Sequence, residues 1–188
     1  LSRGGRPAAG RTAAGRLRVG ASVTGAIGCG AVGAGRCVFH IGSGGSALGP
    51  ELRREALGRD IGNYGVSVLS NIDGQAVDDA CDPHDPESTI IVAVSKTFTT
   101  AETLMNTRAA IAWMQEAGVE DPYGRVIAVT ANPEEAIKFG IDETRILPFN
   151  EGVGGRYSLW SSVGFSVALA LGWEAFEQLL EGAGEMDR

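Results

Sequence analysis

One junction in the middle of the chain constrains the fold more than any other stretch of the sequence. Residues 89–103 run T-I-I-V-A-V-S-K-T-F-T-T-A-E-T, a β-branched apolar segment followed by hydroxyl side chains around Lys96 and a helical pattern from about Thr100. This order predicts a buried strand, a short loop and a helix. A helix start presents unpaired backbone N–H groups and the positive end of the helix dipole. The junction therefore predicts an anion-binding site.

The side chains of this loop favour the same interpretation. Ser95, Thr97, Thr99 and Thr100 supply hydroxyl donors, and Lys96 supplies a full positive charge. The alternative is an ordinary strand with a helix cap, because threonine is common in both places. A cap needs one hydroxyl and not four, yet this segment alone leaves both interpretations open.

Similar strand and helix patterns recur along the chain. We expect strands at residues 37–41, 66–69, 89–94, 125–130 and 144–147. We expect helices at 50–57, after Asp73, at 100–117 and 134–139, behind the glycine-rich loop of 150–164, and at 173–180. Nearly continuous apolar runs such as I-I-V-A-V are typical of parallel strands buried on both faces. The fold class that follows is α/β, a three-layer sandwich with a five-stranded parallel sheet flanked by helices.

The charge of the chain is unevenly distributed. The first 36 residues hold six of the 16 basic residues and none of the 23 acidic ones, so the remainder carries a formal charge near −13. Such a surface repels phosphate backbones, and we expect no nucleic-acid partner. A small phosphate can still bind in a locally positive pocket.

The first 36 residues consist mostly of glycine, alanine and arginine. Arginines ahead of an uncharged stretch have the outline of a signal peptide, but glycine every two or three residues makes the stretch too weakly apolar for a membrane helix. We expect residues 1–36 to be poorly ordered, residues 37–188 to form the folded domain, and no membrane partner. Because the chain begins at Leu1, we expect it to be a piece of a longer protein.

Cysteine and histidine are sparse. Cys29, Cys37 and Cys81 show no spacing typical of a metal site, so we expect no metal and a reducing compartment, the cytoplasm. His40 lies in an apolar run without a carboxylate or nucleophile nearby in the sequence, which favours a structural over a catalytic role. His84 lies in a turn.

Three loops follow predicted strands, at residues 42–49, 95–100 and 151–156, and a parallel sheet places them at one edge. In the first, Gly45 and its neighbours let the backbone approach a ligand closely. Glycines before Arg156 favour a functional arginine over a surface ion pair with Glu151. The spacing of Gly42, Gly44 and Ala47 also fits a relaxed dinucleotide-binding pattern, although the acidic residue expected later is only loosely supplied.

Three motifs in these loops resemble the glucose-6-phosphate isomerases, also called phosphoglucose isomerases. They are I-G-S-G-G-S-A-L-G-P at 41–50, S-K-T-F-T-T-A-E-T at 95–103 and E-G-V-G-G-R-Y-S-L-W-S-S-V-G at 151–164. The resemblance implies a flavodoxin-like sugar-isomerase domain that interconverts glucose 6-phosphate and fructose 6-phosphate in glycolysis and gluconeogenesis. It implies a sugar phosphate as ligand, no cofactor, and a homodimer for the full-length parent.

The resemblance also assigns roles to particular residues. Ser95, Thr97 and Thr100, with Lys96 beside them, are similar to the residues that hold the phosphate. Gly45 and Ser46 are similar to a pair that contacts the sugar phosphate from the first loop. Arg156 resembles the arginine that stabilises the enediolate intermediate, where a fixed positive charge meets developing negative charge. Glu102 resembles the glutamate that steadies a histidine used in ring opening.

The sequence departs from the family in three respects. Ser43 stands where the family usually has isoleucine, and residues 1–36 do not resemble the family's segment before the first loop. The family's base glutamate, ring-opening histidine and C-terminal lysine lie in a second half expected after Arg188. We therefore expect weak sugar-phosphate binding without turnover. A non-catalytic sugar-phosphate-binding module and a nicotinamide-dependent oxidoreductase are the alternative classes.

Overall fold

A parallel five-stranded sheet forms the centre of the protein, with the strand order β2-β1-β3-β4-β5. The computed structural model describes residues 37–47 and 64–188. The strands are β1 (Cys37–Gly42), β2 (Gly65–Leu69), β3 (Thr89–Val94), β4 (Val126–Thr130) and β5 (Ile146–Pro148). All four neighbouring pairs are parallel, so the expected α/β architecture is confirmed.

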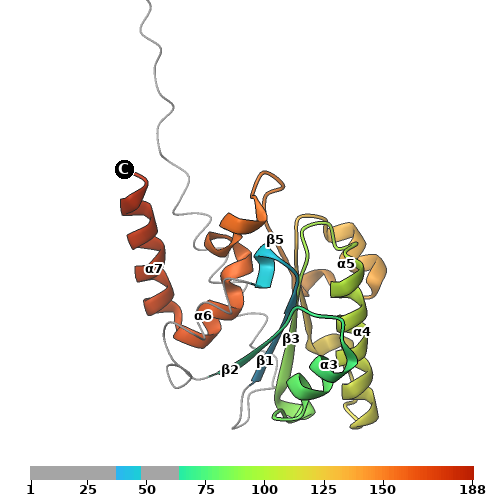
Figure 1. Ribbon diagram of the computed structural model, residues 1–188. Coiled ribbons are helices and arrows are strands. Elements are labelled where there is room, and N and C mark those ends of the chain that lie inside the picture. Colours follow the sequence, from blue (N-terminus) through green and yellow to red (C-terminus); the bar gives the residue numbers. More distant parts are fainter. Residues whose placement is uncertain (1–36, 48–63) are drawn as a thin grey trace, which may run out of the picture. The chain divides into compact units, whose positions relative to one another are not determined.

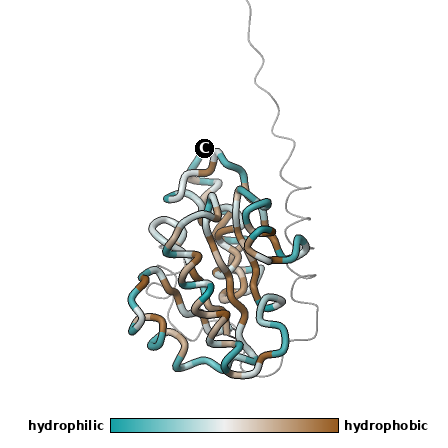
Figure 2. Tube along the Cα trace, turned by 90° about the vertical axis from the view of Figure 1, so that its right-hand side faces the viewer, coloured by the Kyte–Doolittle hydropathy of each residue, from teal (hydrophilic) through white to brown (hydrophobic). Residues whose placement is uncertain are grey.

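Helices cover both faces of this sheet (Figure 1). The described helices are α3 (Gly74–Cys81), α4 (Ala101–Glu116), α5 (Pro133–Phe139), α6 (Phe165–Leu171) and α7 (Trp173–Met186). The first three lie on one side of the sheet and the last two on the other. The strands form the apolar centre between the two layers, as the hydropathy colours of Figure 2 show.

The central strands β1, β3 and β4 explain why the sheet is so apolar. Every side chain of β4 is buried, and β3 has a single half-buried residue, Ile90. Side chains alternate between the two faces of a strand. In β1, Phe39 and Ile41 join the core beneath α4, together with Ile111 and Met114, which leaves His40 on the opposite face.

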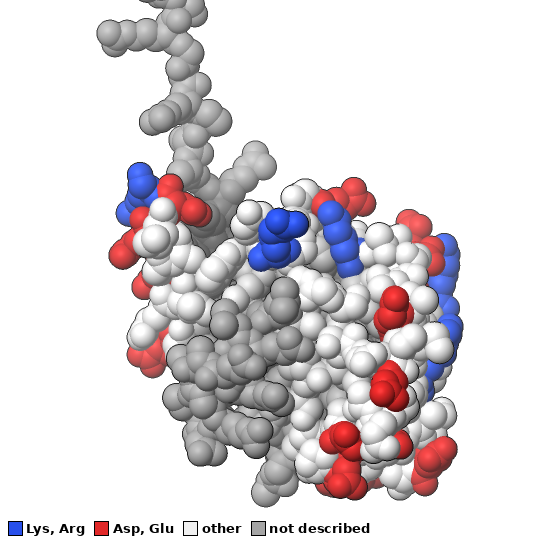
Figure 3. Space-filling model, in the orientation of Figure 1, with Lys and Arg blue, Asp and Glu red and all other residues white. Residues whose placement is uncertain are grey.

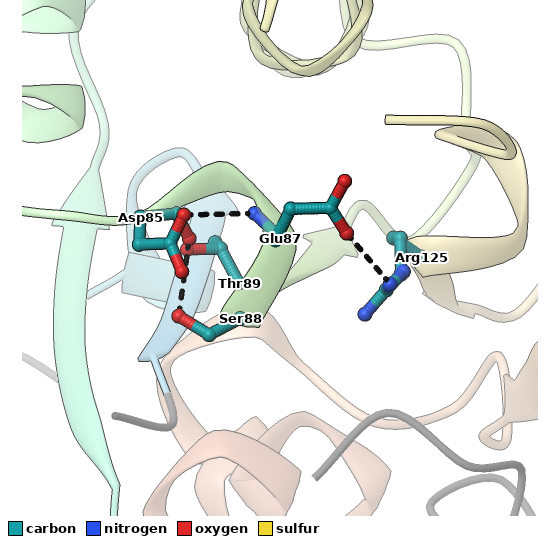
Figure 4. A network of polar contacts seen from close by, with 5 residues as sticks. All are labelled: Asp85, Glu87, Ser88, Thr89 and Arg125. Atoms are coloured by element: carbon teal, nitrogen blue, oxygen red, sulfur yellow. Dashed lines mark hydrogen bonds and ion pairs between the residues drawn. The ribbon is translucent and has the colours of Figure 1, made fainter. Parts of the chain in front are cut away.

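A polar network holds β3 and β4 together at the ends where they begin (Figure 4). The carbonyl oxygen of Asp85 accepts hydrogen bonds from the hydroxyls of Ser88 (3.2 Å) and Thr89 (2.7 Å). Glu87 pairs with Arg125, just before β4, at 3.6 Å. This end of the sheet is therefore fastened by side chains, and the opposite, carboxyl end carries the loops with the predicted chemistry.

Several predicted boundaries need correction. Strand β4 begins at Val126 rather than Arg125, because Tyr123–Arg125 form a 3₁₀ turn. Strand β5 is Ile146–Pro148, since Glu143–Arg145 form another 3₁₀ turn that the Asp142 side chain caps.

The remaining differences concern the C-terminal part and the chain beyond the described residues. Helix α7 continues to Met186, past the expected end at residue 180. The glycine-rich segment after β5 contains the 3₁₀ turns Gly155–Trp160 and Ser162–Gly164. The helix expected at 50–57 and the expectation for residues 1–36 lie outside the described residues.

Candidate functional site

The reversal of strand order between β1 and β3 places the candidate site. The chain moves from β1 outward to β2, then returns to the other side of β1 to form β3. Ligands of open parallel sheets bind at such a switch point, outside the carboxyl ends of the strands. Gly42 pairs in register with Val94, so the loops that begin at Ser43 and Ser95 leave the sheet side by side.

The loop after β3 is held in shape by its own hydroxyl groups. Ser95 is 3% exposed, and its Oγ lies 2.9 Å from Thr100 Oγ1 and accepts a hydrogen bond from the Phe98 N–H at 3.1 Å. Thr97 Oγ1 accepts from the Thr99 hydroxyl at 2.7 Å. The four predicted hydroxyls therefore form two pairs in a compact loop.

Phe98 fixes this loop in an unusual backbone conformation. Its φ of 53° lies in the left-handed region, which costs free energy for a residue with a bulky side chain. The buried ring packs edge-to-face on Phe139, with centroids 5.8 Å apart, and this contact opposes the cost. Strained backbone that surrounding packing maintains is typical of functional loops.

The N-terminus of α4 is available to an anion. Thr100 occupies the N-cap position but makes no side-chain cap hydrogen bond, because its hydroxyl faces Ser95. The backbone N–H groups of the first turn therefore keep their donor capacity, and the dipole of this 16-residue helix adds partial positive charge. Thr100 therefore does not act as the ordinary side-chain cap that the sequence left open as an alternative.

Lys96 extends from the same loop into solvent. Its backbone carbonyl accepts hydrogen bonds from the Thr130 hydroxyl (3.1 Å) and the Ala131 N–H (3.0 Å) at the end of β4. The backbone is thus fixed to the neighbouring strand, while the ammonium group stays exposed at the edge where the loops emerge.

The first loop meets the third loop at two glycines. A Cβ atom built on Gly45 would lie 2.5 Å from both the carbonyl carbon and the carbonyl oxygen of Gly155, and 2.8 Å from the backbone nitrogen of Arg156. Residue 45 also begins a helical turn, after Gly44 with φ 55°. Only glycine fits at position 45, and the structure brings together two segments 110 positions apart in the sequence.

Arg156 is exposed on this third loop. In the described part of the chain, ion pairs join Arg125 to Glu87 and Lys138 to Glu135, and neither involves Arg156. Arg156 therefore does not form the alternative surface ion pair with Glu151. Glu102, in the first turn of α4, is exposed too, with its carboxylate at the same edge.

Both histidines of the sequence are engaged in contacts within the protein. His40 is fully buried, with Nδ1 2.8 Å from Ser166 Oγ and Nε2 2.8 Å from the Ser46 carbonyl oxygen. Burial lowers the pKa of His40 to about 4, so the ring is neutral near pH 7. His84 precedes β3, at the opposite end of the sheet, and binds Ser67 at 2.6 Å. Neither is placed to transfer a proton at the candidate site.

The described surface carries charged side chains of both signs. In Figure 3, acidic side chains are spread over much of the visible face, and basic side chains lie at its upper and right-hand edges with acidic ones beside them. Residues 37–47 and 64–188 contain no cluster of histidine, cysteine, aspartate and glutamate that could hold a metal ion. Within the same ranges, every helix is too short or too polar to cross a bilayer.

Fold and site together define an α/β domain of the sugar-isomerase class, with hydroxyl-rich loops around an uncapped helix start. The chain belongs to the phosphoglucose isomerase family, whose model matches residues 19–188. This match begins within the first 36 residues, which we expected not to resemble the family.

The similarity to individual proteins is high over most of the chain. Glucose-6-phosphate isomerase from Rhizorhabdus wittichii is 65% identical over 81% of this chain, and the Zymomonas mobilis enzyme is 60% identical over 80%. The chain spans only 31% and 30% of these relatives' lengths. A crystal structure of a glucose-6-phosphate isomerase from Chlamydia trachomatis superposes with a TM-score of 0.77 at 27% identity, covering 97% of this chain and 36% of that one.

Two features of the site were not predicted from the sequence. The left-handed backbone of Phe98 carries no local sign, because the residue is neither glycine nor asparagine. The bond between His40 and Ser166 joins residues 126 positions apart. One sequence signal could have predicted the position of His40. Side chains alternate along a strand, so His40 lies on the face opposite to Phe39 and Ile41, toward the second helical layer.

Proposed function

We propose that this chain is the phosphate-binding portion of a glucose-6-phosphate isomerase, the activity that the names of its relatives state. The observation that carries this proposal is the α4 N-terminus, left without a side-chain cap beside the loop of Ser95 and Lys96. A sugar phosphate offers the dianion that such a helix start, an ammonium group and hydroxyl donors together attract.

Each loop has a distinct part in this proposal. The loop of Ser95, Lys96, Thr97, Thr99 and Thr100 binds the phosphate through hydroxyls, main-chain amides and one charge. Gly45 and Ser46 contact the sugar phosphate from the first loop, where the absence of a side chain at position 45 permits close approach.

The proposed catalytic contributions come from Arg156 and Glu102. Arg156 stabilises the negative charge that develops on the sugar oxygens when a proton moves between C1 and C2. Glu102 orients a histidine that must come from outside this chain, because neither His40 nor His84 is free at the site. Isomerisation also needs a base for the proton transfer. We therefore propose that these 188 residues bind substrate weakly and do not turn it over.

Thermal unfolding with two ligands tests the binding proposal. Fructose 6-phosphate is expected to raise the Tm of the chain, because a ligand that binds only the folded state stabilises it, whereas NAD is expected to leave it unchanged. Lys96→Ala and Thr100→Ala are each expected to abolish the shift. Lys138→Ala serves as the control, since Lys138 is an exposed lysine on α5 that pairs with Glu135 at 2.6 Å.

The outcomes separate the three classes of function. Protection by NAD alone would favour the nicotinamide-dependent oxidoreductase. Shifts that survive both site substitutions would contradict the proposed phosphate site. Exchange of the C2 hydrogen of glucose 6-phosphate with solvent, above the rate in buffer, would contradict the proposed lack of turnover. Binding without any exchange fits the proposal and also fits a non-catalytic binding module. Joining the chain to only that part of a relative which it does not cover separates the two, because turnover is expected of the isomerase portion and not of a binding module.

Assembly and location form the last part of the proposal. The intact parent is proposed to be a cytoplasmic homodimer without nucleic-acid or membrane partners. Cys81 is a buried free thiol, which fits a reducing compartment. Gel filtration of the parent, with cross-linking at low concentration, measures the oligomeric state.

A further inference from the structure

His40 connects two of the site's loops from inside the protein. Its ring is 0% exposed and lies between β1 and α6. One ring nitrogen contacts the backbone of Ser46 in the first loop, and the other contacts Ser166, the second residue of α6. None of the roles assigned to the loops so far uses this residue.

The hydrogen bonds of His40 allow one arrangement of protons in the neutral ring. The Ser46 carbonyl oxygen can only accept, so Nε2 must carry the proton and donate at 2.8 Å. Nδ1 is then an acceptor, and the Ser166 hydroxyl donates to it at 2.8 Å. Both contacts are satisfied at once, as a buried polar side chain requires.

The segment from Arg156 to Ser166 connects the third loop to the hydrogen bond between Ser166 and His40. Side-chain bonds tie its turns together, from Ser158 Oγ to the Gly155 carbonyl at 2.7 Å and from Ser161 Oγ to the Ser158 carbonyl at 2.6 Å. Immediately before this segment, Gly155 contacts Gly45 of the first loop. The two loops are thus joined twice, directly at the glycines and indirectly through the imidazole.

We propose that His40 is a positioning residue, whose Nε2–H fixes Ser46 and whose Nδ1 fixes the segment that follows Arg156, so that both loops meet the same sugar phosphate. This inference rests on the proposed function. The residue itself does not touch substrate. The hydrogen bond from His40 Nε2–H to the Ser46 carbonyl restricts rotation of the Ser46 backbone. It thereby sets the direction in which the Ser46 side chain points.

Two substitutions separate the two hydrogen bonds. In His40→Gln the amide reaches the place of Nε2 and can still donate to Ser46, but the acceptor for Ser166 is lost. In His40→Asn the shorter amide lies near the place of Nδ1 and can accept from Ser166, but the donor to Ser46 is lost. Each variant keeps one of the two bonds. A purely space-filling role predicts that any loss of ligand binding follows the loss of stability, because asparagine leaves the larger cavity at this buried position.

Isothermal titration of the 188-residue chain with fructose 6-phosphate measures the difference. We expect His40→Asn to weaken binding by about tenfold or more and His40→Gln by much less, because a misplaced Ser46 loses its proposed hydrogen bond to the charged phosphate. Equal losses in the two variants, or losses that follow their stabilities, would overturn the proposal.

Two ligand-free measurements keep this test separate from that of the proposed function. Hydrogen exchange at the Ala47 amide, which donates to the Gly44 carbonyl at 3.0 Å, is expected to be faster in His40→Asn than in His40→Gln. If the unsubstituted chain binds no fructose 6-phosphate, the proposed function fails, and this exchange rate alone decides the positioning role. If His40→Asn does not fold, ¹⁵N NMR of the unsubstituted chain decides: a proton on Nε2 supports the proposal, and a proton on Nδ1 overturns it.

Discussion

Acidification is expected to destabilise this protein through His40. The ring is buried among neutral partners, and burial lowers its pKa to about 4 from an ordinary value of 6.5, although the hydrogen bond with the Ser46 carbonyl opposes the shift. Between these two values the unfolded chain binds a proton that the folded chain does not. The contribution of neutral His40 to stability is therefore complete above about pH 6.5 and is lost as the pH falls toward 4.

The size of the effect follows from the difference between the two pKa values. One pKa unit corresponds to about 1.36 kcal/mol, so a shift from 6.5 to about 4 corresponds to roughly 3 kcal/mol once the pH is below both values. At pH 5 the unfolded state is almost fully protonated at this site and the folded state is mostly not, which gives a loss of about 2 kcal/mol relative to pH 8. A domain with a total stability of about 5–15 kcal/mol would register this loss clearly.

Urea unfolding at pH 8 and at pH 5 measures the effect, with His40→Gln as the reference, because glutamine does not titrate and all other groups remain the same. The stability of the unsubstituted chain is expected to fall by about 2 kcal/mol more than that of the variant between these pH values. If the two proteins lost stability in parallel, His40 would titrate alike in the folded and unfolded states, and the assignment of a buried neutral ring would be refuted.

Two further predictions concern packing around the loops. Gly45→Ala is expected to destabilise the chain by about 1–3 kcal/mol and to weaken fructose 6-phosphate binding, because its Cβ would meet the Gly155 carbonyl at 2.5 Å. Gly74→Ala, at the open start of α3, is the control and should cost nothing in urea unfolding; equal losses would contradict the contact. Phe98→Ala removes a buried ring that packs on Phe139 and is expected to cost about 3 kcal/mol in the same assay, and an unchanged midpoint would show that this ring does not stabilise the loop.

Much of the fold could be predicted from local patterns. The apolar run of β3, the Asp73 cap of α3 and Pro133 in the first turn of α5 lie where the sequence placed them. Boundaries failed where side chains close short turns, as Asp142 does when it accepts hydrogen bonds from Thr144 ahead of β5. Such turns shift the start of a strand by two or three residues, and apolar periodicity does not locate a boundary that finely.

The candidate site was predicted less completely. The sequence indicated which loops carry hydroxyls, glycines and positive charge, because those residue types are visible without a fold. The contact between Gly45 and Gly155, and the bridge from His40 to Ser166, depend on how the segment after β5 packs back toward β1. Nothing in the sequence around either partner specifies the other.

By itself, the sequence determined the kinds of elements, their order and the chemistry at the end of each strand, since these follow from propensities and periodicities that act over a few residues. Only the tertiary structure decided that Thr100 turns its hydroxyl to Ser95 rather than to its own helix, and that a buried imidazole ties two loops together. The physical reason is that a polar group takes the partner that packing brings within reach, and packing is a property of the whole chain.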